Sequence, residues 1–179
     1  QIEFTDSIDS IKNEIQQLNG IEHIIWLAPD DSHKSLPGLL DDESLIDSQE
    51  RGVIFCFRMI KALLASGYGN KNLGWSVLTT AAQPIDKHDA VNPAHASLHG
   101  LLGSMAKEYR NWKVRVVDLG ATSNKSNKDW PLAALFSLPF DTDGNIVAYR
   151  GGEWYRQKLI PVQTPQLEQS KYKHGGVYV

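Results

Sequence analysis

Apolar residues in this 179-residue chain follow two patterns that alternate along the sequence. Recurrence every three or four residues predicts helices, and the longest such stretch is Glu43–Ser66. Continuous apolar runs predict strands, and the run within Ile21–Ala28 predicts a central strand covered on both faces. Because parallel strands need long crossover connections, strands that alternate with helices indicate a mainly parallel sheet.

The residues before this run predict a short strand and then a capped helix. Ile2 and Phe4 alternate with polar residues, as in a strand. Either Asp6 or Ser7 can cap the following helix, and Gly20 is placed to end it. The apolar face of this helix has four residues at helical spacing: Ile8, Ile11, Ile15 and Leu18.

The long helix follows a polar loop, Asp30–Asp42, and is expected to end near Gly67. Gly67 should stop the helix, because glycine tolerates the backbone conformation that ends one. Its buried face is expected to contain Val53, Phe57, Ile60 and Leu64.

The rest of the chain is organised around a strand, loop, helix and strand between Gly74 and Gly120. These four parts are Trp75–Thr80, Ala81–Asn92, Pro93–Arg110 and Val114–Leu119. Their order predicts a parallel β-α-β crossover.

The last third predicts a short helix and a hairpin. After a polar connection at Thr122–Asp129, a helix is expected at Trp130–Leu138, with Pro131 in its first turn. The strand-like stretches Asn145–Arg150 and Glu153–Ile160 are joined by glycines and predict a β-hairpin. The fold class is therefore α/β, a doubly wound, mainly parallel sheet with helices on both faces and an appended C-terminal β-hairpin.

Composition narrows the class of protein without naming a function. Hydrophobic residues make up 41% of the chain and charged residues 22%, as in ordinary globular domains. A formal charge of −3 provides no basic field for nucleic acid. No apolar run approaches the roughly 18 to 20 residues that span a bilayer. The single cysteine, Cys56, excludes an internal disulfide and suits a reducing cytosol, so we expect a cytoplasmic protein with a buried structural thiol.

Two motifs could suggest ligand binding, and neither has the required context. Gly67-Tyr68-Gly69 leaves a helix and enters a strand, whereas a dinucleotide-binding turn leaves a strand and enters a helix. His95 and His99 are four residues apart on a helix, but a metalloprotease pair needs glutamate where Ala96 stands. We expect surface or boundary histidines and no metal site.

The remaining polar and aromatic candidates also have structural explanations. Ser104 lacks the flanking glycines of a nucleophile elbow, and the carboxylates Asp41, Asp42, Glu43 and Glu50 complement a helix dipole. The tryptophans are expected in the core or at its boundary: Trp26, Trp75, Trp112, Trp130 and Trp154. From the residues alone we therefore assign no catalytic, cofactor-binding or metal-binding residue.

Several stretches, in order along nearly the whole chain, carry a resemblance to a known family. They are Ile24–Pro29, Ile60–Leu64, Trp75–Ala82, Asn92–Leu101, Val114–Leu119, Ala148–Tyr155 and Gly175–Val179. Together they resemble the ketoreductase domains of modular polyketide synthases, which are similar to two short-chain dehydrogenase units in tandem. The match is to the first unit, the structural subdomain, which looks like a truncated Rossmann unit.

The resemblance implies that the decisive catalytic positions are altered here. Where an active unit has a catalytic serine at a strand end, this chain has Thr79-Thr80. Pro93 stands where the proton-donating tyrosine would be, and Ser97 where a lysine or asparagine would assist. Lys107 and Tyr109 are wrongly spaced to replace them. The glycine-rich nucleotide loop is also missing from the sequence.

One further motif belongs to the other unit of that family. Leu40-Asp41-Asp42 resembles a stereochemical marker of the catalytic unit, and here it lies in the equivalent loop of the structural unit. We interpret it as an echo of the duplication.

The resemblance implies a scaffold, inactive alone, with residues 1–162 as the structural subdomain. Such units usually have another strand and helix before the region that resembles Gln1–Phe4, so we expect the fold to start upstream. Val162–His174 is a polar linker, and Gly176–Val179 opens a strand, so residues 163–179 would lead into a downstream catalytic subdomain. That partner would bind NADPH and reduce β-ketoacyl groups on an acyl carrier protein. A split or independent Rossmann-like interaction module is the alternative, and an active reductase is the third reading.

Overall fold

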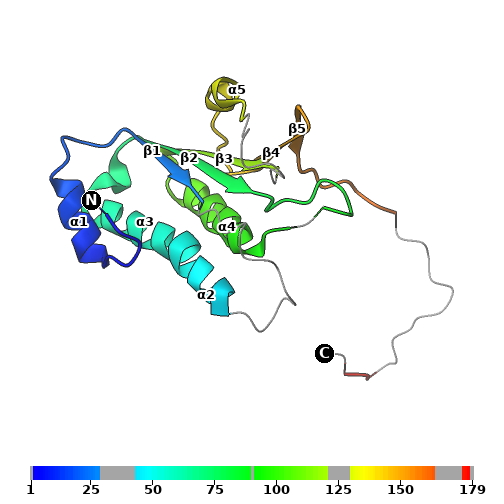
Figure 1. The fold of residues 1–179 in the computed structure, drawn as a ribbon, viewed down its shortest axis with the longest axis horizontal. Helices are drawn as coiled ribbons and strands as arrows, with labels where there is room; N and C mark the ends of the chain where they lie inside the picture. The colour runs from blue at the N-terminus through cyan, green and yellow to red at the C-terminus, as the bar shows by residue number, and fades with distance from the viewer. Residues whose placement is uncertain (1, 29–42, 90, 121–129, 164–174, 178–179) are drawn as a thin grey trace.

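A computed structural model describes residues 2–28, 43–89, 91–120, 130–163 and 175–177, and Figure 1 shows its fold. One five-stranded sheet has the strand order β1-β2-β3-β4-β5. The strands are β1 (His23–Leu27), β2 (Leu73–Thr80), β3 (Trp112–Leu119), β4 (Ile146–Arg150) and β5 (Glu153–Arg156). The first four are parallel and β5 is antiparallel to β4, so the expected sheet and hairpin are confirmed.

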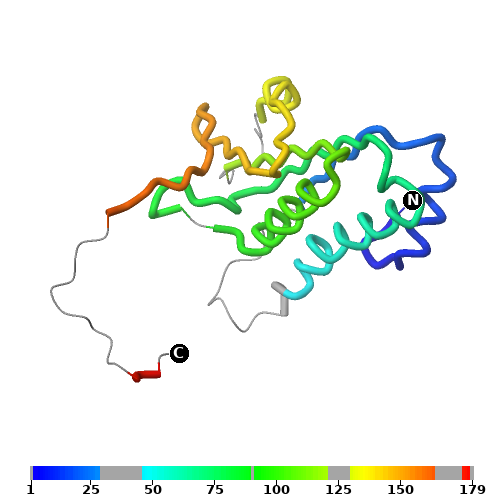
Figure 2. Tube along the Cα trace, turned by 180° about the vertical axis from the view of Figure 1, so that it is seen from behind, coloured from blue at the N-terminus to red at the C-terminus, as the bar shows by residue number. Residues whose placement is uncertain are grey.

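Helices lie on both sides of this sheet (Figure 1). They are α1 (Ile8–Gln16), α2 (Glu43–Gln49), the π-helical segment η1 (Glu50–Ile54), α3 (Phe55–Ala65), the 3-10 turn η2 (Tyr68–Asn70), α4 (Pro93–Glu108) and α5 (Leu132–Ser137). Figures 1 and 2 show α3 and α4 on one face and the short α5 on the other. The doubly wound arrangement follows from this placement.

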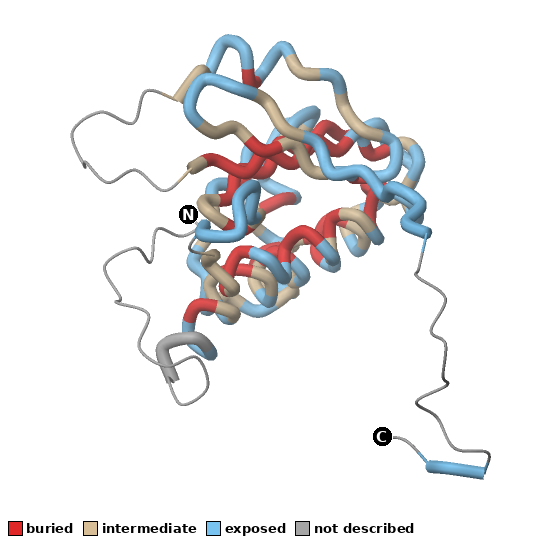
Figure 3. The backbone as a smooth tube through the Cα atoms, turned by 90° about the vertical axis from the view of Figure 1, so that its right-hand side faces the viewer, coloured by how far each residue is buried: buried red, intermediate tan, exposed pale blue. Residues whose placement is uncertain are grey.

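The larger core lies between the sheet and the helices α1, α3 and α4. Its buried side chains include Ile11, Ile60, Leu63, Trp75, Val77, Leu98, Leu102, Val114 and Val116. A smaller cluster on the opposite face joins Leu78, Val117 and Leu119 to Leu135 of α5. Because side chains pack against both faces of β2 and β3, these two strands are almost completely buried. Figure 3 shows the buried segments in the interior of the fold and the exposed ones around them.

The first strand is at the sheet edge, which corrects the expectation of a covered central strand. Within the described residues β1 pairs only with β2. Trp26 is buried against Phe55 at a ring separation of 5.2 Å, whereas Ile25 is 56% and Leu27 59% exposed. A continuous apolar run shows that the side chains of a strand are hydrophobic. Whether both faces of the strand are covered depends on the helices and strands that pack against it.

The N-terminal residues form a turn, so the strand expected at Ile2 and Phe4 is wrong. The turn closes locally, because the Asp6 N–H donates to the Glu3 carbonyl at 3.0 Å. The helix cap is Ser7, whose hydroxyl accepts from the Ser10 N–H at 3.2 Å. Ile11 and Ile15 are buried as expected, but Leu18 lies beyond the helix end and is exposed.

The second expected helix is interrupted by a π-helical segment. Gly52 is buried in η1, where a Cβ would lie 3.8 Å from the Ala94 carbonyl oxygen. A π-helical turn contains more residues than an α-turn, so the buried face changes register across it. Phe57, which was expected on the buried face, is 47% exposed, whereas its neighbour Cys56 in α3 is completely buried. Gly67 ends the helix at a φ of +81°, as expected.

The C-terminal elements are shorter than the sequence pattern suggests. Pro131 occupies the N-cap position of α5, before the first helical turn. The hairpin ends at Arg156, and Leu159 and Ile160 are exposed, because within the described chain they have no strand partner. Gly176 and Val177 are not in a strand.

Some expectations fall on residues that the structure does not describe. These are the loop Asp30–Asp42 with its Leu40-Asp41-Asp42 motif, the connection Thr122–Asp129, residues 164–174 of the linker and the final pair Tyr178-Val179. In the described part of the chain, no helix has both the length and the apolar character needed to cross a membrane.

Candidate functional site

Polar side chains gather where β2 and β3 end, at the carboxyl edge of the parallel sheet. In folds of this kind, ligands bind outside this edge. Thr79 and Thr80 lie at the end of β2, Asp118 lies at the end of β3, and His95 and His99 lie on α4, which packs on one face of the sheet. The hairpin contributes Arg150 from the last residue of β4.

Asp118 is the centre of this cluster. Its side chain is completely buried and its carboxylate accepts four hydrogen bonds. Oδ1 accepts from the Thr79 hydroxyl at 2.6 Å and the Ala82 N–H at 2.9 Å. Oδ2 accepts from the Gln83 N–H at 3.0 Å and from Arg150 Nη2 at 2.5 Å. A buried carboxylate with this many donors is held in place and well compensated.

Arg150 ties three segments together through its guanidinium. Besides the Asp118 carboxylate, it donates to the Asp118 carbonyl at 2.8 Å and the Gln83 carbonyl at 2.8 Å. A third backbone bond joins it to the Tyr149 carbonyl at 3.0 Å. The hairpin, the end of β3 and the loop after β2 are therefore fixed relative to one another.

The loop after β2 turns through an unusual backbone conformation. Ala81 has a φ of +51°, in the left-handed region that costs an alanine about 1–2 kcal/mol. The turn points the next two amides, of Ala82 and Gln83, at Asp118. Those charge-assisted bonds offset the strain.

His99 has a defined protonation state in this network. The Thr79 hydroxyl has one proton, which it donates in the hydrogen bond to Asp118. Its oxygen therefore accepts a hydrogen bond from His99 Nε2 at 2.9 Å. Nδ1 then faces the Gln83 side-chain amide at 3.5 Å. Burial lowers the pKa of His99; the Asp118 charge opposes this shift and His95 adds to it. The neutral imidazole is therefore favoured.

His95 is buried one turn earlier on α4. The Thr80 N–H donates to its Nδ1 at 3.1 Å. The expectation that His95 and His99 lie at the surface or boundary is therefore wrong: they are 2% and 8% exposed. Both occur on the face of α4 that packs on the sheet, where each satisfies a polar group of β2.

The family resemblance matched Thr79, Pro93 and Ser97 with catalytic positions, and each of these residues has local contacts here. Thr79 points inward to Asp118 and His99. Pro93 is the first residue of α4, capped by Asn92, whose side-chain oxygen accepts from the Ala94 N–H at 3.1 Å. Ser97 donates to the side-chain oxygen of Gln49 at 2.6 Å.

Lys107 and Tyr109 are at the opposite end of α4 from this cluster. Lys107 lies in the last turn, and the Tyr109 ring stacks on Trp112 at 4.9 Å.

The other candidates have structural roles. Ser104 donates to the Gly100 carbonyl at 3.0 Å, and Glu50 pairs with Arg58 at 2.9 Å. Asp41 and Asp42 lie outside the described residues, as does the side chain of Glu43. Among the tryptophans, Trp26, Trp75 and Trp112 are buried and Trp130 and Trp154 half-buried, as expected.

Cys56 is a structural thiol, as its apolar neighbours indicate. It is completely buried, and burial raises its pKa to about 12. The described residues contain no group of three or more His, Cys, Asp or Glu side chains that could hold a metal ion.

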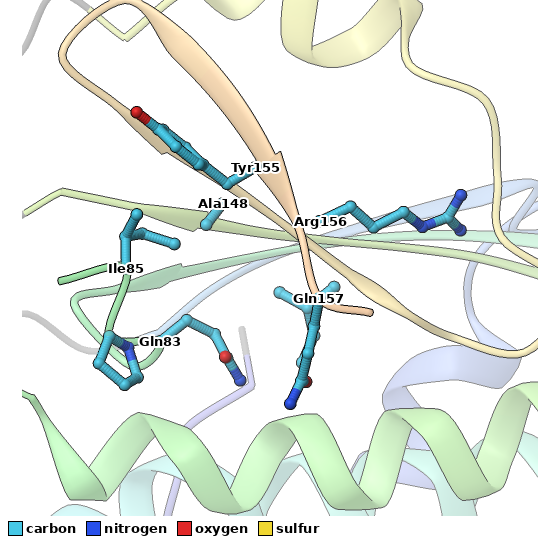
Figure 4. A pocket seen from close by; sticks show the side chains of 8 residues that line it. Gln83, Ile85, Ala148, Tyr155, Arg156 and Gln157 are labelled. Atoms are coloured by element: carbon cyan, nitrogen blue, oxygen red, sulfur yellow. The ribbon is translucent and has the colours of Figure 1, made fainter. Parts of the chain in front are cut away.

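A cavity of about 310 Å³ borders the cluster between the loop after β2 and the hairpin. Its lining comprises Gln83, Pro84, Ile85, Ile146, Ala148, Tyr155, Arg156 and Gln157. In Figure 4 the side chains of Gln83 and Gln157 extend into the space above α4, while Ala148 lies on the strand behind. Tyr155 is bonded to Glu153 and Arg156 to Asp141, so neither ionisable group of the lining is directed at a substrate.

Sequence reasoning missed Asp118 and Arg150, although one signal was available. Asp118 is a charged residue within the apolar run Val116-Val117-Asp118-Leu119. A charge in a strand buried on both faces needs a partner. That partner comes from the hairpin, and its identity depends on the fold.

Comparison with known proteins finds relatives among bacterial polyketide synthases, although no protein-family model matches. PksN of Bacillus subtilis is 42% identical over 178 residues, which are 99% of this chain and 3% of PksN. PksM of the same organism is 42% identical over 174 residues, 97% of this chain and 4% of PksM. ThaG of Burkholderia thailandensis is 31% identical over 159 residues, 89% of this chain and 3% of ThaG. The chain thus spans a small part of each relative.

Solved structures with the same fold include a keto acid-selecting NRPS module with adenylation, ketoreductase and pseudo-Asub domains. It has a TM-score of 0.69 and 20% identity, over 90% of this chain and 14% of that one. A putative short-chain alcohol dehydrogenase from Burkholderia multivorans has a TM-score of 0.56 and 14% identity, over 84% and 72% of the two chains. The chain is therefore homologous, over nearly its whole length, to a segment of bacterial polyketide synthases, and it has the Rossmann-like fold of short-chain dehydrogenases/reductases.

Proposed function

We propose that this chain is the non-catalytic structural subdomain of a polyketide synthase ketoreductase. The observation that carries the proposal is the state of the aligned catalytic positions. The Thr79 hydroxyl is committed to Asp118 and His99, and Pro93 occupies the start of α4. Proline has no ionisable proton, so this position cannot protonate a substrate oxygen.

The cluster at the carboxyl edge suits a structural role. Asp118 already accepts from Thr79, two backbone amides and Arg150, so its carboxylate has no lone pair directed at a substrate. His99, whose pKa is lowered by burial, is bonded within the network. These contacts join β2, β3, α4 and the hairpin, and they would give a catalytic neighbour a rigid surface to pack on.

The proposal assigns the structural and the catalytic roles to different parts of one polypeptide. Residues 1–162 form the scaffold, and residues 163–179 connect it to a catalytic subdomain in the same polypeptide. That subdomain binds NADPH and carries the catalytic serine, tyrosine and lysine or asparagine. The complete domain reduces a β-ketoacyl thioester presented by an acyl carrier protein.

Reductase assays on two proteins test the proposal. The first is this chain alone, and the second is this chain extended through the catalytic unit expected after it. With NADPH and a β-ketoacyl N-acetylcysteamine thioester, we expect NADPH oxidation only by the extended protein. Turnover by the chain alone would refute the scaffold role.

A matched variant makes the assay specific for the aligned position. Thr79→Val removes the hydroxyl at the site where an active unit has serine and nearly keeps the shape of the side chain. If the position is structural, the extended protein with this change retains its rate, and the chain alone stays inactive. A rate loss of tenfold or more in the folded extended variant argues for catalysis within this chain.

A further inference from the structure

Arg115 is a buried charge on the face of the sheet opposite α4. It lies in the middle of β3 and is only 7% exposed. Its guanidinium carbon is 4.4 Å from the centre of the Phe140 ring, and Nη1 donates to the Ser76 hydroxyl at 3.1 Å. Neither partner carries a negative charge.

The guanidinium has unused hydrogen-bonding capacity. Arg115 Nε is buried and has no hydrogen-bond partner in the described part of the chain. Among the described residues, no carboxylate forms a salt bridge with Arg115, in contrast to Arg58, Arg110, Arg150 and Arg156. Burying an unpaired charge is costly, and here burial lowers the pKa of Arg115.

His23, which shares Ser76 with Arg115, does not supply the missing negative charge. The Ser76 hydroxyl that Arg115 contacts is also 3.0 Å from His23 Nε2. Partial burial and the Arg115 charge lower the pKa of His23. A neutral histidine satisfies the hydroxyl and leaves the guanidinium uncompensated.

A half-open cavity of about 310 Å³ adjoins Arg115, which is within the size range of small-molecule sites. Its apolar walls are Val116, Leu138, Pro139, Phe140, Val147 and Trp154, and its polar walls are Arg115, Asp141, Asn145, Tyr155 and Arg156. Most of the lining is therefore apolar, with two cationic side chains and one carboxylate.

Asp141, the carboxylate of the cavity, is already committed to other groups. Its Oδ1 accepts from the backbone amides of Asp143 at 2.9 Å and Asn145 at 3.1 Å. Its Oδ2 pairs with Arg156. Asp141 and Arg156 neutralise each other, so the cavity keeps one uncompensated positive charge, that of Arg115.

We propose that this cavity binds a small organic acid, whose carboxylate pairs with the Arg115 guanidinium and whose apolar body contacts Phe140 and Trp154. Guanidinium and carboxylate groups match in planar geometry, and such pairs form two parallel hydrogen bonds. This binding activity goes beyond the scaffold role and does not depend on it.

Benzoate is a suitable probe, because it combines one carboxylate with a flat apolar body. Benzamide has nearly the same shape without the charge and serves as the ligand control. We expect benzoate to raise the melting temperature of the chain saturably, and benzamide to leave it unchanged. NMR shift titration gives the dissociation constant independently of stability.

Variants assign the binding to this residue. Arg115→Met keeps the contact with Phe140 and removes the charge, so benzoate should bind at least tenfold more weakly. Arg115→Lys retains a charge without the planar fork and should bind with intermediate affinity; it tests the site even if the methionine variant fails to fold. Arg110→Met removes an exposed arginine and should bind benzoate like the unaltered chain.

The ligand-free proteins give a second, separate readout. If Arg115 is an uncompensated buried charge, Arg115→Met melts at a higher temperature than the unaltered chain when no acid is present. The proposal is overturned if benzoate shows no saturable binding, if benzamide binds equally well, or if Arg115→Met retains the affinity.

Discussion

The guanidinium of Arg150 binds Asp118 twice: Nη2 lies 2.5 Å from the side-chain Oδ2, and Nη1 lies 2.8 Å from the main-chain carbonyl oxygen. One arginine therefore fixes both the charge and the backbone at the end of β3. The side chains are 19% and 0% exposed, which places the pair among buried ion pairs.

Removing one partner of this pair should be strongly destabilising. Arg150→Met leaves the Asp118 carboxylate buried with neutral donors only, so we expect a loss of about 3–5 kcal/mol in the free energy of unfolding. Urea denaturation measures it. Arg110→Met breaks an exposed pair with Asp143 and should cost less than about 1 kcal/mol. Equal losses in both variants would contradict a special role for the buried pair.

The Thr79 hydroxyl should matter more for stability than its size suggests. Thr79→Val preserves the shape but leaves the His99 Nε2–H without an acceptor and removes a donor to Asp118. We expect a loss of about 1–3 kcal/mol, measured by chemical denaturation. Thr79→Ser keeps the hydroxyl and should cost less. If the valine variant is as stable as the serine variant, the hydrogen bonds of the Thr79 hydroxyl to His99 and Asp118 contribute little to stability.

Stability should fall on mild acidification because of His99. Burial holds the pKa of His99 below its ordinary value of 6.5, so the unfolded chain binds the proton more readily. The favourable contribution of neutral His99 is complete above that ordinary value and is lost as the pH falls through the lowered pKa. The free energy of unfolding, measured across this range, should decrease toward acid.

A glutamine variant isolates the His99 contribution to this pH dependence. His99→Gln keeps a donor for Thr79 and cannot titrate, so its stability should fall less steeply toward acid. Part of the slope should remain, because the pKa of His23 is lowered as well. If the free energy of unfolding falls equally steeply with pH in the variant and the unaltered chain, His99 does not cause the pH dependence.

Gly144 should tolerate no side chain, because it combines a positive φ with close packing. Its φ is +68°, and a Cβ would lie 2.8 Å from Gly103 Cα in α4. Gly144→Ala should therefore cost more than the about 1–2 kcal/mol of left-handed strain alone. Gly151→Ala is the matched control, since its φ is +56° with no atom within 4 Å of a Cβ. Thermal melting should separate the two variants, and equal losses would mean that the close approach costs nothing.

Local patterns were sufficient for most elements of the fold. The crossover from Trp75 to Leu119, the stop at Gly67 and the glycine-linked hairpin depend on periodicity and turn residues, which act over a few positions. The burial of Cys56 also follows from its apolar neighbours. That Pro93 has no ionisable proton can also be read from the sequence alone.

Contacts between distant segments determined the rest. Ile25 and Leu27 are as apolar as residues of β2, yet they are exposed, because burial depends on what packs above them. Phe57 is apolar as well, yet it is 47% exposed, whereas Cys56 and Ile60 of the same helix are buried.

The polar interior was likewise decided by the tertiary structure. Asp118 and Arg150 are 32 residues apart and meet only when β4 pairs with β3. The sequence by itself determined the central crossover, the helix stop at Gly67 and the hairpin, because these depend on local patterns. Only the tertiary structure paired Asp118 with Arg150 and left Arg115, among the described residues, without a carboxylate partner, because electrostatic compensation depends on distances across the fold.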